Sequence, residues 1–170
     1  MGTVTRSRDQ SKHNVVIRFI AMCYKDAHQK LAEIGRAPRL RFCERMENVG
    51  MYVVVMDYED GVGSYARLVD REHVEQRRVV VKTLHDENYV HGDIREPGVL
   101  VTTGGLKLTD FDWCGKASTA QYPADVSLIP SLGWHDGVRR GGLIAKEHDK
   151  HMFKLLTGLP YAAQGPESSR

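Results

Sequence analysis

The stretch His91-Gly92-Asp93-Ile94-Arg95-Glu96-Pro97-Gly98, followed by Asp110-Phe111-Asp112-Trp113, decides how this sequence is interpreted. Between these segments, residues 99–101 and 106–108 are short apolar runs around Thr103-Gly104-Gly105, which favours a tight turn. A hairpin returns the chain to the end at which it began. The two aspartates that flank it, Asp93 and Asp110, should therefore lie in one pocket.

Two carboxylates in one pocket suit two chemical tasks. One accepts a proton from an attacking hydroxyl, and the other binds a hard cation such as Mg²⁺ through oxygen. Phosphoryl transfer uses both, because a metal neutralises the charge that spreads over the phosphate oxygens. The alternative for Asp93 and Asp110 is a structural role, since Asp commonly ends strands and begins turns.

The first part of the chain predicts a strand, a helix and a hairpin. Residues 1–13 are polar and charged, and we expect them to be disordered. Residues 15–20 favour a strand, and residues 25–34 favour a helix. The helix should bury Ala27, Leu31 and Ile34. Residues 40–43 and 51–56 indicate an antiparallel hairpin.

The rest of the chain predicts a linker and then a mostly helical part. Residues 57–63 are acidic and contain two glycines, which is typical of a linker. Residues 70–88 and 145–156 favour helices, and Asp70 can cap the first of them. That helix should turn Val74, Val81 and Leu84 toward the core. Residues 113–140 favour loops.

The overall composition excludes some classes of protein. A net charge of +2 with scattered basic residues argues against nucleic-acid binding. The most apolar stretch, residues 15–24, is too short to span a bilayer, and the polar start does not look like a signal peptide. Cys23, Cys43 and Cys114 are odd in number and lack metal-site spacing, so we expect reduced thiols and an intracellular, cytoplasmic protein.

The segment from His91 to Gly98 resembles the catalytic loop of protein kinases in its HGD variant, which is common among aminoglycoside phosphotransferases and atypical kinases. Asp110-Phe111-Asp112 resembles the kinase D-F-G segment. The sequence over residues 14–157 is similar to that of fungal protein-kinase-like proteins. Four segments carry this similarity: VHGDIREP at 90–97, LTDFDWCGKA at 108–117, YPADVS at 122–127 and KEHDKHMFKLL at 146–156.

The resemblance implies roles for individual residues. Asp93 would be the catalytic base, and Arg95 would neutralise the transferred phosphate. Asp110 would bind Mg²⁺. Asp149 looks like the buried aspartate that holds the catalytic-loop backbone in kinases, and His91 would be structural, with its ring bonded to backbone near Asp110.

The resemblance also implies a nucleotide site. Arg18 would contact the ATP phosphates, with Asp26 as its helix partner. The backbone of Met56, Asp57 and Tyr58 would meet the adenine ring.

This sequence departs from the kinase pattern at three places. Gly98 stands where kinases have a metal-binding Asn, and Arg18 stands where they have Lys, which is not an equivalent cation. Upstream of Val15 the sequence has only Gly2, so no Gly-rich loop is expected, nor the two strands that carry it. Losing that cover removes backbone donors and admits water. Asp112 replaces the motif glycine, either as a second metal ligand or as a solvated loop acid.

We therefore predict an α+β chain with a protein-kinase-like two-lobed fold, a truncated N-terminal lobe and a mainly helical C-terminal lobe. The expected division is residues 1–13 as a disordered terminus, 14–58 as a partial N-terminal lobe, 59–157 as the C-terminal lobe and 158–170 as a flexible tail.

The predicted function is an ATP- and Mg²⁺-dependent phosphotransferase acting on a hydroxyl acceptor, protein or small molecule. Its site residues would be Asp93, Arg95, Arg18, Asp26, Met56, Tyr58, Asp110 and Asp112. The alternative is a non-catalytic, pseudokinase-like interaction module or a fragment. Gly98 and the absence of a Gly-rich loop from the sequence favour this alternative. A weaker option is a metal-dependent phosphohydrolase.

Overall fold

The structure is a computed structural model that describes residues 2–6, 9–63, 70–96 and 98–161, with side chains from Asn14 onward. Within these ranges the chain is a mixed α+β fold with three α-helices and small antiparallel sheets. The helices are α1 (Lys25–Glu33), α2 (Arg71–Asp86) and α3 (Lys146–Thr157). A single 3₁₀ turn, η1 (Pro130–Leu132), interrupts the long loop that precedes α3.

The largest sheet has four strands in the order β1-β2-β4-β3. These strands are β1 (Gly2–Arg6), β2 (Asp9–Ile20), β3 (Leu40–Met46) and β4 (Met51–Asp57). A second sheet, in the order β5-β7-β8, contains β5 (Gly61–Gly63), β7 (Val99–Thr102) and β8 (Gly105–Leu108). A small third ladder pairs β6 (Tyr89–Val90) with β9 (Gly115–Lys116).

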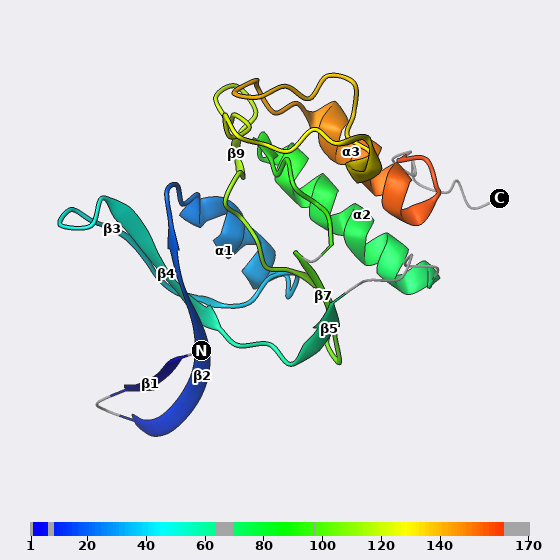
Figure 1. The fold of residues 1–170 in the computed structure, drawn as a ribbon. Coiled ribbons are helices and arrows are strands. Elements are labelled where there is room, and N and C mark those ends of the chain that lie inside the picture. The colour runs from blue at the N-terminus through cyan, green and yellow to red at the C-terminus, as the bar shows by residue number, and fades with distance from the viewer. Residues whose placement is uncertain (1, 7–8, 64–69, 97, 162–170) are drawn as a thin grey trace.

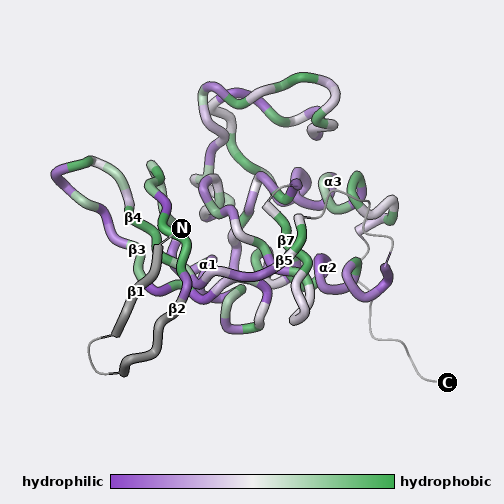
Figure 2. The backbone as a smooth tube through the Cα atoms, turned by 60° about the horizontal axis from the view of Figure 1, so that its bottom comes forward, coloured by the Kyte–Doolittle hydropathy of each residue, from purple (hydrophilic) through white to green (hydrophobic). Residues whose placement is uncertain are grey.

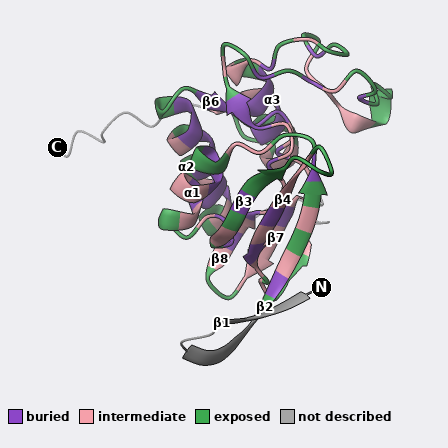
Figure 3. Ribbon diagram, turned by 90° about the vertical axis from the view of Figure 1, so that its left-hand side faces the viewer, coloured by how far each residue is buried: buried purple, intermediate pink, exposed green. Residues whose placement is uncertain are grey.

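The helices lie on one side of the strands. Figures 1 and 3 show α1 between the four-stranded sheet and α2, with α3 on the far side of α2. Hydrophobic residues follow β4 and β7 in Figure 2. On the opposite face of the sheet the side chains of Ile17 and Phe19 are exposed.

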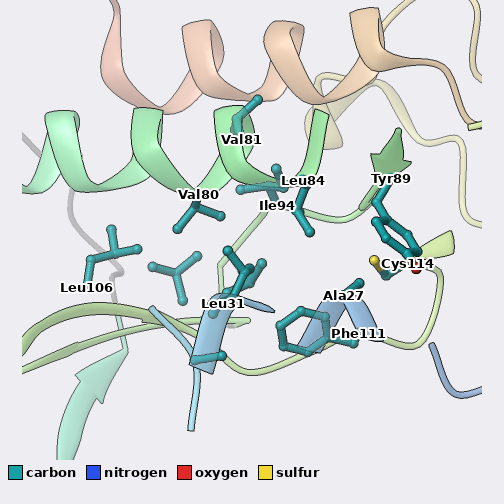
Figure 4. Packing of buried hydrophobic residues seen from close by; sticks show 13 residues of the cluster. Ala27, Leu31, Val80, Val81, Leu84, Tyr89, Ile94, Leu106, Phe111 and Cys114 are labelled. Atoms are coloured by element: carbon teal, nitrogen blue, oxygen red, sulfur yellow. The ribbon is translucent and has the colours of Figure 1, made fainter. Parts of the chain in front are cut away.

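The main core lies between α1, α2 and the β7–β8 hairpin. Leu31 from α1, Val81 and Leu84 from α2, and Leu106 from β8 are all buried there, and Phe111 closes the cluster (Figure 4). The hairpin therefore packs on the helices by its apolar face, which fixes the position of the segment that follows it.

The predicted hairpins and helices are confirmed. β3 pairs with β4 and β7 pairs with β8, both antiparallel. α2 begins after Asp70, whose side chain accepts a hydrogen bond from the N–H of Glu72 at 2.8 Å. α1 and α3 begin and end within about one residue of the predicted bounds.

Two expectations about the start of the chain are wrong. Residues 1–13 were expected to be disordered and to contribute no strands, but β1 and β2 form an antiparallel pair in which Gly2 lies opposite Val15. Backbone hydrogen bonds hold such a pair together whatever its residue composition. The sequence between the two strands, residues 7–8, is Ser-Arg, so it does not supply the glycines of a Gly-rich loop.

Three smaller expectations also need correction. The predicted linker contains β5, which pairs with β7, because a short Gly-Val-Gly segment can complete a sheet edge. Ile34 is 44% exposed, since α1 ends at Glu33 and the chain turns away there. Cys23 and Cys43 form a disulfide, and Cys114 is the free, buried cysteine among the described residues. The tertiary fold brings the two half-cystines together, which their spacing did not indicate.

The predicted tail lies outside the described residues from residue 162 onward. The last described residue, Tyr161, packs against the core, and its ring lies against Phe153 with centroids 5.3 Å apart. No helix in the described ranges is long and apolar enough to cross a membrane.

Candidate functional site

A cavity of about 310 Å³ lies between the four-stranded sheet and the β7–β8 hairpin. Its volume is at the lower end of the range usual for small-molecule sites. Its lining comes from both parts of the molecule: Val16, Arg18, Pro38, Met56, Asp57, Tyr58, Glu59, Gly98, Leu100, Thr109 and Asp110. Four residues predicted from the sequence, Arg18, Met56, Tyr58 and Asp110, therefore meet at one cavity.

The cavity is lined by both apolar and charged side chains. Val16 on β2, Met56 on β4 and Leu100 on β7 are apolar. Arg18, Asp57, Glu59 and Asp110 are charged. This combination of apolar walls with a few polar groups is typical of small-molecule sites.

Two backbone N–H groups at the end of β4 are occupied within the sheet. The N–H of Asp57 donates to the carbonyl of Arg39, and the N–H of Tyr58 donates to the carbonyl of Asn14, both at 2.9 Å. These two donors are already used by the sheet. A ring in the cavity would therefore be held by its apolar walls and by other polar groups, not by the N–H groups of Asp57 or Tyr58.

Arg18 bridges the two acids of the Asp110-Phe111-Asp112 segment. Its Nη1 lies 3.2 Å from Asp110 Oδ1, and its Nη2 lies 2.9 Å from Asp112 Oδ2. β2 carries Arg18 and the turn after β8 carries the acids, so this contact joins segments far apart in the sequence. The three side chains are about one third exposed, at 31%, 36% and 33%.

The two acids titrate in opposite directions. Burial by itself raises the pKa of Asp110, but the charge and hydrogen bond of Arg18 outweigh burial and lower that pKa below its usual value. Burial, together with the charge of Asp110, raises the pKa of Asp112 to about 6. Asp112 Oδ1 is buried and has no hydrogen-bond partner within the described part of the chain.

Asp93 lies beside this pair. Its charge contributes to the raised pKa of Asp112. A Cβ atom placed on Gly98 would lie 3.9 Å from the carbonyl oxygen of Asp93 and 3.3 Å from Asp110 Cβ. The hairpin thus brings the segments of Asp93 and Asp110 together with Gly98 between them, but Asp93 does not line the cavity that Asp110 lines.

Asp93 is paired with Arg95. Arg95 Nε donates to Asp93 Oδ1, and the guanidinium lies over the ring of Trp134, 4.3 Å from its centroid. Trp134 in turn packs in a cluster with Trp113 and Tyr122. Arg95 therefore links the candidate base to the 113–140 loop.

Asp149 holds the loop that carries His91 and Asp93. Asp149 is 1% exposed, and its carboxylate accepts hydrogen bonds from the N–H of His91 at 2.9 Å and of Gly92 at 2.8 Å. His85 Nε2 lies 3.0 Å from the same carboxylate. The prediction that this acid is buried and fixes the loop backbone is confirmed.

His91 is buried, as its structural interpretation requires. Its Nδ1 accepts a hydrogen bond from the N–H of Asp93 at 3.2 Å, and its ring meets Phe111 edge-on with centroids 5.5 Å apart. The prediction that the His91 ring bonds to backbone near Asp110 is therefore wrong. The ring contacts the neighbouring Phe111 instead, because the loop turns back on itself at Gly92, whose φ is +79°.

Asp26 does not occupy the place expected for it. Its Oδ2 accepts a hydrogen bond from Tyr89 Oη at 3.4 Å, while Arg18 pairs with Asp110 and Asp112. Two carboxylates near the end of the Arg18 side chain attract the guanidinium more strongly than one short acid on α1. The expected Arg18–Asp26 pair is therefore wrong.

The sequence interpretation did not find the contact by which α1 reaches the site. His28 stacks on Phe111 with centroids 4.4 Å apart and ring planes 8° apart, and its Nε2 is bonded to the carbonyl of Pro38 at 2.9 Å. The sequence did offer a signal for this contact, because His28 follows Ala27, which was predicted to lie on the buried face of the helix. This stack positions Phe111 between the two acids.

The described residues contain no cluster of three or more His, Cys, Asp or Glu side chains arranged to hold a metal ion. Asp110 and Asp112 are the oxygen donors that suit Mg²⁺ here, and the unpartnered Asp112 Oδ1 fits a hard cation. Comparison with protein-family models and with curated proteins finds no match for this chain.

Proposed function

We propose that this chain is an ATP-dependent phosphotransferase of protein-kinase type, with a two-lobed fold in which the cavity between the lobes takes the nucleotide. The observation that carries the proposal is the cavity that gathers Arg18, Met56, Tyr58 and Asp110 from distant segments. The Asp93 loop, fixed by Asp149, lies beside it.

Each wall of the cavity has a role in this proposal. The adenine ring would lie against the apolar side chains of Val16, Met56 and Leu100. The phosphates would extend toward Arg18, whose planar fork of donors matches phosphate oxygens. Asp110 and Asp112 would hold Mg²⁺, which neutralises the charge on the transferred phosphoryl group.

Asp93 would accept the proton of the attacking hydroxyl. Its carboxylate pairs with Arg95, which orients it. Arg95 stacks on Trp134, so this pair is held in place from the side of the 113–140 loop. The acceptor, protein side chain or small molecule, would approach from that side.

Calorimetric titration with ATP and Mg²⁺ tests nucleotide binding. We expect saturable binding that Asp110→Asn weakens at least about tenfold, because it removes a carboxylate that would hold the cation. Asp125→Asn, on an exposed loop position, is the matched control and should leave binding unchanged. No binding of ATP with either Mg²⁺ or Mn²⁺ would overturn the proposal.

A second candidate is a non-catalytic, kinase-like interaction module. Gly98 supplies no metal ligand, and the N–H groups of Asp57 and Tyr58 are already bonded within the sheet. This candidate predicts that the chain never transfers the γ-phosphoryl group, whether or not ATP binds. Transfer that disappears in Asp93→Asn, with ATP binding retained, would decide for the enzyme.

A further inference from the structure

We propose that Arg18 and a divalent cation compete for Asp110 and Asp112, and that the phosphates of a nucleotide free both carboxylates for the cation by binding Arg18. This inference rests on the proposed function, because it takes the same cavity as the nucleotide site. It assigns Arg18 a positioning role: it couples nucleotide binding to metal binding.

The geometry of the bridge is the first argument. A single guanidinium contacts both acids, at 3.2 Å from Asp110 Oδ1 and 2.9 Å from Asp112 Oδ2. Arg18 contacts one oxygen of each carboxylate, so a cation held by the same two carboxylates would lie close to the guanidinium. Since all three side chains are about one third exposed, at 31%, 36% and 33%, solvent and ligands can reach them.

Charge is the second argument. Arg18 keeps its proton in proteins, so it cannot yield its place by becoming neutral. A divalent cation placed between Asp110 and Asp112 would repel the guanidinium at a few ångströms, where charges interact strongly in a partly buried site. The guanidinium must therefore move when the cation binds.

The cavity supplies the place to which Arg18 can move. Arg18 lines the 310 Å³ cavity, together with Asp110 and Gly98. A phosphate chain in the cavity would offer the guanidinium the oxygen pairs that it binds best. Contacts with phosphate oxygens would thus replace the contacts that Arg18 loses when it leaves the two carboxylates.

The third argument comes from Gly98. Because glycine supplies no metal ligand, a cation at this place would depend more on Asp110 and Asp112. A side chain at position 98 would begin 3.3 Å from Asp110 Cβ, next to the acids, but glycine supplies no ligand there. Asp112 Oδ1 is buried and lacks a hydrogen-bond partner among the described residues, so it is a donor atom that Arg18 leaves free. The cation then depends on the same two acids that Arg18 contacts.

Binding of Mn²⁺ alone, followed by the loss of the free-ion signal in electron paramagnetic resonance, tests the competition. Arg18→Met keeps the length of the side chain and removes the charge, so we expect it to bind Mn²⁺ at least about tenfold more tightly than the unmodified chain. Asp112→Asn in the Arg18→Met background should reverse the gain.

Arg45→Met is the matched control. Arg45 lies on β3 of the same sheet and pairs with Glu47, with Nη1 3.4 Å from Glu47 Oε2, and neither residue lines the cavity. This variant should bind Mn²⁺ as the unmodified chain does. Equal or weaker Mn²⁺ binding by Arg18→Met would overturn the inference, as would equal gains in both variants.

Inorganic tripolyphosphate tests the second half of the inference. In the unmodified chain we expect it to tighten Mn²⁺ binding to the protein at concentrations where little Mn²⁺ is complexed by phosphate, and in Arg18→Met this coupling should be lost. If Arg18→Met fails to fold, Arg18→Lys replaces it and should show an intermediate Mn²⁺ affinity. If the chain does not bind ATP but Arg18→Met still binds Mn²⁺ more tightly, the proposed function fails and the competition between Arg18 and the cation stands. The failure of the proposed function can therefore be told apart from the failure of this inference.

Discussion

Gly92 shows how a single residue shapes the loop that carries Asp93. Its φ of +79° lies in the left-handed region, which disfavours residues with a side chain. A Cβ atom there would lie 2.7 Å from Cδ1 of Ile144, which is fully buried. Glycine is therefore required by both the backbone and the packing.

We predict that Gly92→Ala lowers the free energy of unfolding by about 3 kcal/mol, because backbone strain and overpacking add. Gly141→Ala is the control: its φ is +65°, but nothing lies within 4 Å of the added Cβ. It should cost about 1 kcal/mol from strain alone. Urea unfolding of both variants measures the difference, and equal costs would contradict the packing argument.

At the scale of elements, α1 links the sheet to the site. The Cys23–Cys43 disulfide joins the segment before α1 to β3, and His28 on α1 stacks on Phe111. A small cavity lined by Cys23, His28, Phe111 and Asp112, among others, separates the disulfide from the acids. The position of α1 therefore bears directly on the geometry of the acid pair.

Removing the disulfide by Cys23→Ser together with Cys43→Ser should destabilise the chain. The bridge closes a loop with a sequence separation of 20, and a loop of that size contributes about 3 kcal/mol through the unfolded state. Urea unfolding with and without a dithiol reductant measures this contribution. The reductant should weaken the unmodified chain by a similar amount and leave the double variant unchanged, and a reductant effect on the double variant would contradict the assignment.

At the scale of the whole molecule, buried histidines connect stability to pH. Burial lowers the pKa of His28 below 6.5, and its bond to the Pro38 carbonyl opposes this only in part. Burial, helped by the nearby His135, also lowers the pKa of His148. Because the unfolded chain binds protons more readily than the folded chain, stability is complete above about pH 6.5 and falls as the pH drops below that value.

We therefore predict that the free energy of unfolding decreases between pH 7.5 and pH 5.5, by at most about 1.4 kcal/mol per pH unit for each histidine. His28→Gln removes one of these groups and should make the pH dependence shallower. His73→Gln, a histidine of α2 outside the stack on Phe111, is the control and should preserve the slope. An unchanged slope in His28→Gln would contradict the assignment to His28.

Local signals predicted the elements well. The turn at Gly104 and Gly105 between two apolar runs gave the β7–β8 hairpin, and Asp70 marked the start of α2. These features depend on backbone conformation and capping within a few residues. The position of Asp149 under the loop was also predicted, but through the resemblance to kinases and not through its local sequence.

The contacts of the site were predicted less well, because each depends on distant segments. Arg18 was expected to meet Asp26 and instead bridges Asp110 and Asp112, 92 and 94 residues away. The backbone of residues 56–58 was expected to meet an adenine ring, but the sheet uses the N–H groups of Asp57 and Tyr58. Sheet pairing and charge competition of this kind cannot be read from local patterns.

The sequence by itself determined that an acid pair flanks a hairpin, because turn chemistry and strand propensity act within about ten residues. Only the tertiary structure decided what surrounds that pair. It paired Cys23 with Cys43, stacked His28 on Phe111 and brought Arg18 between Asp110 and Asp112. Such contacts arise when the sheet and the helices pack together, since burial and charge then select partners by distance in space.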